Sequence, residues 1–148
     1  MSGRVFAIFF LALAALFGGA LWYFQTRAYY EEVSGLTSID VQGAQVPVSS
    51  YRGLDADTSP NKLRGCFTVD PAAFADVPEA PNPEPLTAPG WFPCFDVEAI
   101  ATDLAEGRAK AYLAGDETPE GAEGYEILRM IAVYPDGRAY LWRHYREN

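Results

Sequence analysis

Hydrophobic residues in this chain form one long uninterrupted block, followed by short alternating runs. The block is residues 5–24, VFAIFFLALAALFGGALWYF, which hold no charged or strongly polar side chain. At about 1.5 Å per residue, such a helix measures about 30 Å, the thickness of a bilayer's hydrocarbon core. The block therefore predicts a transmembrane anchor helix. Because no breaker follows before Ser34-Gly35, we expect this helix to occupy residues 1–33.

A cleaved signal peptide is the alternative to an anchor. Arg4 would be its basic region, and Gly18-Gly19-Ala20 offers small residues for cleavage. The apolar run nevertheless continues through Trp22 to Phe24 and then meets Arg27. An aromatic and basic border of this kind is typical of a span that leaves the bilayer. We therefore favour an anchor, and either interpretation puts residues 34–148 in the same compartment.

Beyond the anchor, alternation of apolar and polar positions predicts a sheet with one short helix. The strands expected are residues 37–41, 45–49, 62–69, 109–114, 125–134 and 138–146. Residues 97–105 have apolar side chains at helical spacing after Asp96, a candidate N-cap. Residues 51–60 are rich in turn formers and predict a loop. The expected fold class is α+β, with a small, mostly antiparallel sheet domain at residues 34–148.

The last expected strand can bury either of its two faces. One face would carry Ala139, Leu141 and His144, and the other Tyr140, Trp142 and Tyr145. Successive side chains of a strand point to opposite sides, and both sets hold large apolar groups. The alternation therefore leaves the register of this strand open.

Two cysteines flank a proline-rich segment. Cys66 and Cys94 are the only cysteines, and residues 70–93 hold seven of the eleven prolines. Two cysteines in a small exported domain usually pair, whereas two buried thiols would fit a cytoplasmic domain. We expect a Cys66–Cys94 disulfide, which would make the proline-rich segment a strap folded back on the domain rather than a linker.

The charge of the domain is strongly negative. Residues 28–148 hold nine basic and all twenty acidic residues, a formal net charge of −11. Nucleic acid and anionic lipid are therefore poor partners, whereas a basic periplasmic protein would be attracted.

We expect a single-pass protein of a bacterial inner membrane, with a cytoplasmic N-terminus and a periplasmic C-terminal domain.

Two groups of residues are candidates for contacts with other proteins. Small residues that would let another helix approach the anchor are Ala12, Ala15, Gly18 and Gly19. Acidic residues that would form a docking surface are Asp116, Glu117, Glu120, Glu123 and Glu126. The alternatives are the ordinary composition of bacterial anchors for the first group and a solvated loop for the second.

No motif in the sequence is a catalytic signature, and we expect no enzyme, cofactor or metal. His144 is the only histidine, and a lone histidine on a terminal strand is more often structural. Asp55 and Asp57 resemble the opening of a calcium loop, but Cys66 stands where its closing glutamate belongs. An enzyme would need these two carboxylates paired in a cleft.

Several distinctive strings carry a resemblance that covers nearly the whole chain. They are the aromatic Tyr-Glu-Glu-Val step, Leu54 to Pro60, Leu63-Arg-Gly-Cys-Phe67, Pro85 to Pro89, Trp91-Phe-Pro-Cys-Phe-Asp96 and Ala132 to Trp142. Together they resemble a family of small single-span bacterial envelope proteins of unknown function. The resemblance implies no activity. Leu128-Arg129-Met130 is less polar than expected for it, which leaves the environment of this strand open.

The function expected is that of a non-catalytic accessory or scaffolding protein of an inner-membrane complex, respiratory or photosynthetic. It would bind an integral membrane complex through its helix. The alternative is a membrane-anchored periplasmic binding or assembly module that acts transiently on exported proteins.

Overall fold

The structure is a computed structural model, and it describes residues 2–26, 30–56, 60–80 and 82–147. The chain divides into two compact units, Met1–Glu31 and Glu32–Asn148.

The first unit contains the helix α1, Gly3–Thr26. Its segment Gly3–Phe24 is long and apolar enough to span a membrane, which is compatible with a single-pass membrane protein. The expected continuation of this helix to Val33 is wrong, because Glu31–Ser34 forms the strand β1. The half-buried Val33 packs against the core of the second unit, so that tertiary contacts override the helical preference of this segment.

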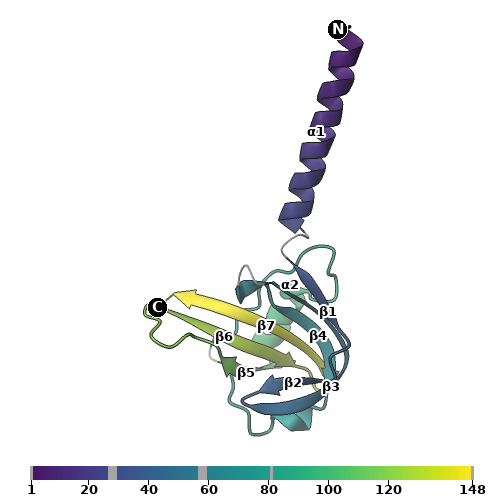
Figure 1. The fold of residues 1–148 in the computed structure, drawn as a ribbon. Coiled ribbons are helices and arrows are strands. Elements are labelled where there is room, and N and C mark those ends of the chain that lie inside the picture. The colour runs from purple at the N-terminus through teal and green to yellow at the C-terminus, as the bar shows by residue number, and fades with distance from the viewer. Residues whose placement is uncertain (1, 27–29, 57–59, 81, 148) are drawn as a thin grey trace. The chain divides into compact units, whose positions relative to one another are not determined.

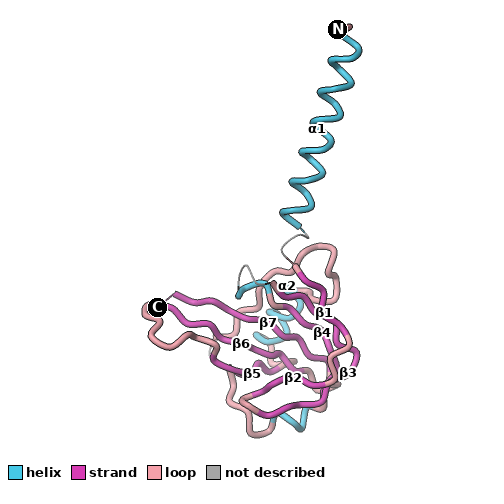
Figure 2. Tube along the Cα trace, in the orientation of Figure 1, coloured by secondary structure: helices cyan, strands magenta, loops and turns pink. Residues whose placement is uncertain are grey.

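The second unit is built on a seven-stranded sheet (Figures 1 and 2). After β1, its strands are β2 (Ser38–Val41), β3 (Ala44–Asp55), β4 (Arg64–Val69), β5 (Lys110–Asp116), β6 (Tyr125–Val133) and β7 (Arg138–Glu147). The strand order is β1-β3-β4-β7-β6-β5, and β2 also pairs with β3. The pairs β2–β3, β3–β4, β4–β7, β6–β7 and β5–β6 are antiparallel. The predicted α+β class is confirmed.

The described part of the domain also contains three short helices. They are η1 (Pro60–Lys62), η2 (Pro71–Phe74) and α2 (Val97–Ala105). The N-cap predicted for α2 is confirmed, because the Asp96 carboxylate accepts a 3.2 Å hydrogen bond from the Ala99 backbone N–H. The buried side chain of Ile100 packs this helix against the rest of the domain.

The sheet curls so that its two ends meet. The backbone N–H of Gln42, in the β2–β3 turn, donates to the carbonyl of Ala114 on β5 at 2.7 Å. The side-chain amide of Gln42 donates to the carbonyl of Leu113 at 2.6 Å. These bonds close the sheet into a barrel-like shape with an inner and an outer face.

A bulge in β3 decides which of its residues face inward. Val46 and Val48 are buried in the inner core, and the register with β4 then shifts between Ser49 and Arg52, where Ser50 has a φ of 54°. Because a bulge inserts one extra residue, the inward positions continue at Tyr51 instead of Ser50. Residues 51–55 thus extend β3, and the loop expected over residues 51–60 is wrong for that part.

Both faces of the sheet are covered, which explains the apolar character of β6. The inner core includes Ile131 and Val133 from β6. The alternate residues Leu128, Met130 and Ala132 are also buried. The sequence left open which face of β7 is buried, and the structure shows that both are. Ala139 and Leu141 join the inner core, while Trp142 on the other face is fully buried beside Phe95.

The proline-rich segment is a strap held on the outer face. The predicted Cys66–Cys94 disulfide is confirmed, with a Cα–Cα distance of 6.3 Å. Arg64, only 5% exposed, donates from its guanidinium to the strap carbonyls of Leu86 at 3.2 Å and Thr87 at 3.0 Å. The strap also pairs with the edge of β5 through a bridge between Glu79 and Tyr112.

Candidate functional site

The inner core of the barrel is apolar at one end and charged at the other. Along β6, the inward positions run from Val133 through Ile131 to Arg129. Along β7 they run from Ala139 through Leu141 to Arg143. Arg129 and Arg143 are directly paired in the β6–β7 register, so their side chains lie side by side on one face. Two like charges in this position require counter-charges.

Glu117 supplies a shared counter-charge for the two arginines. Its Oε1 atom lies 2.5 Å from Nη1 of Arg129, and its Oε2 atom accepts a hydrogen bond from Nε of Arg143. Nη2 of Arg129 also donates to the carboxylate of Asp40 at 3.0 Å and to its backbone carbonyl at 2.8 Å. Arg143 has a looser second contact, 3.6 Å from Nη1 to the Asp55 carboxylate.

A cavity of about 260 Å³ opens beside these arginines, and we call it the mouth cavity. Its polar lining comes from Ser38, Asp40, Tyr51, Asp55, Arg129 and Arg143, and its apolar lining is Val33, Leu36, Ile39, Leu63 and Leu141. The Arg129 and Arg143 side chains are only 17% and 18% exposed. A concave, mostly preformed site with a few convergent polar groups is the usual form of a small-ligand site.

Glycines make room for the aromatic and cationic side chains of this end. A Cβ atom on Gly65 would lie 2.9 Å from the Tyr51 hydroxyl, and one on Gly53 would lie 2.7 Å from its ring. A Cβ atom on Gly115 would lie 3.1 Å from Nη2 of Arg129. Burial, and then the charge of Asp55, raise the pKa of Tyr51, so its phenol stays protonated at neutral pH.

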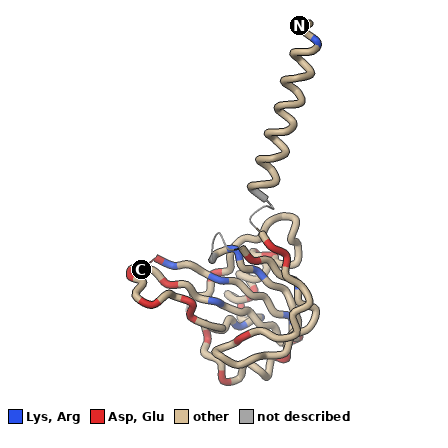
Figure 3. The backbone as a smooth tube through the Cα atoms, in the orientation of Figure 1, with Lys and Arg blue, Asp and Glu red and all other residues tan. Residues whose placement is uncertain are grey.

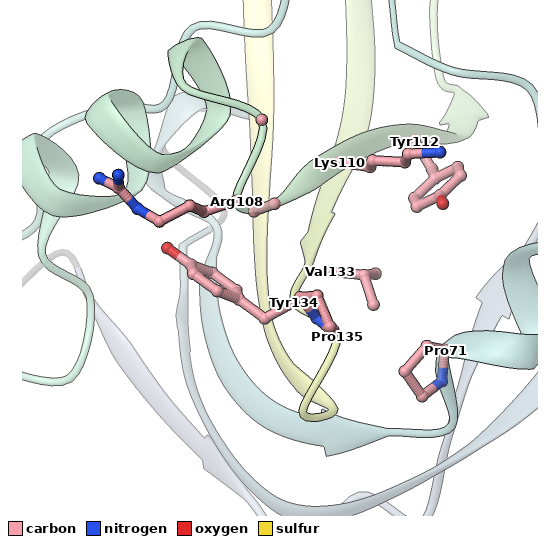
Figure 4. A pocket seen from close by; sticks show the side chains of 9 residues that line it. Pro71, Arg108, Lys110, Tyr112, Val133, Tyr134 and Pro135 are labelled. Atoms are coloured by element: carbon pink, nitrogen blue, oxygen red, sulfur yellow. The ribbon is translucent and has the colours of Figure 1, made fainter.

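A second, smaller depression of about 180 Å³ lies between the end of α2, the start of β5 and the β6–β7 turn (Figure 4). Figure 4 shows the Tyr134 ring reaching towards Arg108. The Tyr134 hydroxyl donates to Asp103 at 2.5 Å, and Arg108 Nε lies 2.7 Å from the same carboxylate. These bonds lower the pKa of Asp103, while burial and the bond to Asp103 raise that of Tyr134. These polar groups bind one another and join α2 to the sheet. We therefore interpret the depression as a structural contact and not as a ligand site.

The acidic residues predicted as a docking surface separate into two groups. They follow the connection from β5 to β6 (Figure 3). Glu117 faces the arginines of the mouth cavity, and Glu126 lies 4.0 Å from Arg146. Asp116, Glu120 and Glu123 are exposed. The structure therefore gives Glu117 an internal role and leaves three exposed carboxylates for the docking prediction.

Of the other residues singled out from the sequence, Asp55 lines the mouth cavity, and the rest lie apart from it or outside the described part. His144 accepts a 3.2 Å hydrogen bond at Nδ1 from Arg146, and its pKa is lowered by burial and then by the charge of Arg146. Asp55 lines the cavity, whereas Asp57 lies outside the described residues. On α1, Ala12, Ala15, Gly18 and Gly19 are all exposed.

Sequence reasoning missed the arginine pair. Arg129 interrupts the apolar strand sequence YEILRMIAVY, and Arg143 occupies an alternate position in RAYLWRHYR. A charged residue at an inward position of a strand covered on both faces was the available signal.

The fold and site define a class of protein with a small, disulfide-closed, barrel-like domain that follows an apolar helix. Residues 34–148 match the family model described as a family of unknown function, DUF6446, and the chain belongs to that family. No curated protein and no solved structure matches the chain.

Proposed function

We propose that this protein is a non-catalytic accessory or scaffolding protein of a respiratory or photosynthetic inner-membrane complex. In this proposal α1 crosses a bacterial inner membrane, with its N-terminus in the cytoplasm and the domain in the periplasm. The supporting observation is the surface of α1. Ala12, Ala15, Gly18 and Gly19 lie within about 120° of the helix circumference, and a Cβ atom on Gly18 or Gly19 would meet no other atom within 4 Å.

Small residues on a membrane helix allow a second helix to approach closely, so that backbone and side chains pack over a large area. Ala12, Ala15 and Gly19 are three and seven residues apart, which puts them on the same side of the helix. The exposed large residues Phe10, Leu13 and Phe17 lie on the opposite side of the helix. This contrast favours packing of the small face against another membrane helix over contact with lipid all round.

Affinity purification of the full-length protein from native membranes in mild detergent, with mass spectrometry of the companions, tests this proposal. We expect a stoichiometric membrane complex that is lost in Ala15→Leu. The matched control is Ala20→Leu, which makes the same change about 140° around the helix. Retention of the complex in Ala15→Leu, or equal loss in both variants, would contradict a specific helix contact.

A second function is favoured by the mouth cavity, that of a membrane-anchored periplasmic module that binds exported proteins transiently. In that case no stoichiometric companion co-purifies with the wild type. Chemical cross-linking in intact cells then captures exported proteins, and the yield depends on Arg143 and is unchanged by Ala15→Leu.

A further inference from the structure

The two arginines of the mouth cavity differ in how many of their N–H groups form hydrogen bonds within the protein. Arg129 is held by three bonds, one to Glu117 and two to Asp40. Arg143 donates one hydrogen bond, from Nε to Glu117, and forms a longer ion pair with Asp55 through Nη1. Its Nη1 atom lies 3.6 Å from Asp55, beyond hydrogen-bond range, and its Nη2 atom has no hydrogen-bond partner among the described residues. The outer edge of the Arg143 guanidinium is therefore open to an acceptor.

The position of this guanidinium is fixed before any ligand arrives. Glu117 holds Nε, and β7 is paired on this side with β6. Asp55 is restrained in turn, because its Oδ1 atom accepts a 2.8 Å hydrogen bond from the backbone N–H of Ala56. A preorganised and largely buried guanidinium loses less freedom on binding than an exposed one, and its electrostatic attraction is stronger than in water.

The rest of the cavity suits a small apolar group. Its volume of about 260 Å³ is slightly below the roughly 300–1,000 Å³ of typical ligand pockets, so only a small group would fit. Leu36, Ile39 and Leu63 contribute apolar walls. The Tyr51 side chain adds a hydroxyl to the polar lining.

We infer that the mouth cavity binds a carboxylate group carried on a short apolar body. The carboxylate would accept two hydrogen bonds from the outer edge of Arg143, because a guanidinium presents parallel N–H groups that match the two oxygens. The body would pack on the apolar wall formed by Leu36, Ile39 and Leu63. Glu117 acts as a positioning residue that holds both arginines.

This ligand chemistry has two sources, a free aliphatic acid and the C-terminal residue of a polypeptide. The inference deepens the binding-module function and rests on it, and it is independent of what α1 contacts. Loss of ligand binding would therefore leave the co-purification result unchanged.

Calorimetric titration of the full-length protein in lipid nanodiscs with three probes tests the inference. N-acetylleucine carries the carboxylate and a leucine body, 4-methylpentanoate is the free acid with the same body, and N-acetylleucinamide is the neutral control. We expect at least one acid to bind about tenfold or more tightly than the amide, because only the acids offer charge-assisted bonds. Preference for N-acetylleucine would identify a polypeptide terminus, and preference for 4-methylpentanoate a free acid.

Substitution of Arg143 supplies the second arm. Arg143→Lys keeps the charge and loses the fork of donors, so we expect acid binding to weaken by about fivefold or more. Arg138→Lys, at an exposed site outside the cavity, is the matched control and should bind as the wild type does. The melting temperature of each variant reports that it is folded. Equal affinity for acids and amide, no binding of either acid, or unchanged binding in folded Arg143→Lys would overturn the inference.

Discussion

Nη1 of Arg129 lies 2.5 Å from Oε1 of Glu117, at the charged end of an otherwise apolar core. The second oxygen of the same carboxylate binds Arg143, so one carboxylate bridges the two guanidinium groups. Both arginines are less than one-fifth exposed, and they are paired across neighbouring strands. Glu117 therefore determines whether this end of the barrel can hold two adjacent cations.

Glu117→Gln tests this dependence. The substitution leaves two largely buried guanidinium groups side by side with less counter-charge. We expect it to destabilise the domain by about 1–3 kcal/mol, a range that allows for solvent screening of the partly exposed Glu117. Glu120→Gln makes the same change at an exposed site and should alter stability by about 0.5 kcal/mol or less. Denaturant unfolding measures both, and equal stabilities would contradict the assigned role of Glu117.

Arg64 is predicted to hold the strap on the outer face. Arg64→Met removes a buried cation and leaves the Leu86 and Thr87 carbonyls without their donor, at a cost of about 2–4 kcal/mol. Arg64→Met should also increase the rate of amide hydrogen exchange more in residues 82–89 than in β6. Arg138→Met, at an exposed arginine, is the control. Unchanged exchange in the strap would show that Arg64 does not anchor it.

The disulfide is predicted to make a large contribution to stability. Cys66 and Cys94 are separated by 28 residues in the sequence, and a ring of this length is worth about 3–4 kcal/mol in the loop-entropy model. The Cys66→Ser/Cys94→Ser double variant should lose that amount in denaturant unfolding. Reductant should lower the stability of the wild type to a similar level and have no effect on the variant. A variant as stable as the wild type would contradict the prediction.

His144 is predicted to make stability depend on pH just below neutrality. Burial, followed by the charge of Arg146, lowers its pKa in the folded protein below the ordinary value of about 6.5. As pH falls through 6.5, the unfolded chain binds a proton more readily than the folded one, so stability falls until the folded pKa is reached. His144→Gln should therefore show a smaller decrease in melting temperature between pH 7 and 5.5.

Carboxylates provide the internal comparison for this pH effect. The pKa of Asp116 and Asp136 is lowered by hydrogen bonds to Thr118 and Arg138 respectively. Their contribution is present above their unfolded pKa and is lost only at more acidic pH. A wild type and His144→Gln with parallel profiles down to pH 5.5 would argue against a shifted histidine.

Local pattern was sufficient to predict much of this fold. The α2 helix could be predicted from its cap and apolar spacing, and the hairpin of β6 and β7 from two apolar runs around Pro135-Asp136-Gly137. The disulfide followed from having two cysteines at the ends of one segment. These features depend on residues close in sequence or on a single possible pairing.

The mouth cavity could not be predicted in the same way. Tyr51 and Asp55 face it because the bulge at Ser50 shifts the alternation of inward and outward side chains by one residue. The turn-forming residues in this segment predicted a loop instead of a strand. Arg64 could not be placed either, because its partners Leu86 and Thr87 are more than twenty residues away in the strap. Both features arise from tertiary packing, which local periodicity does not encode.

Migration of the full-length protein in native gels of membranes extracted with mild detergent tests the proposed function most directly. The account predicts that the wild type migrates within a larger complex and that Ala15→Leu, but not Ala20→Leu, migrates at the position of the isolated chain. A wild type that migrates by itself would contradict the accessory-subunit proposal.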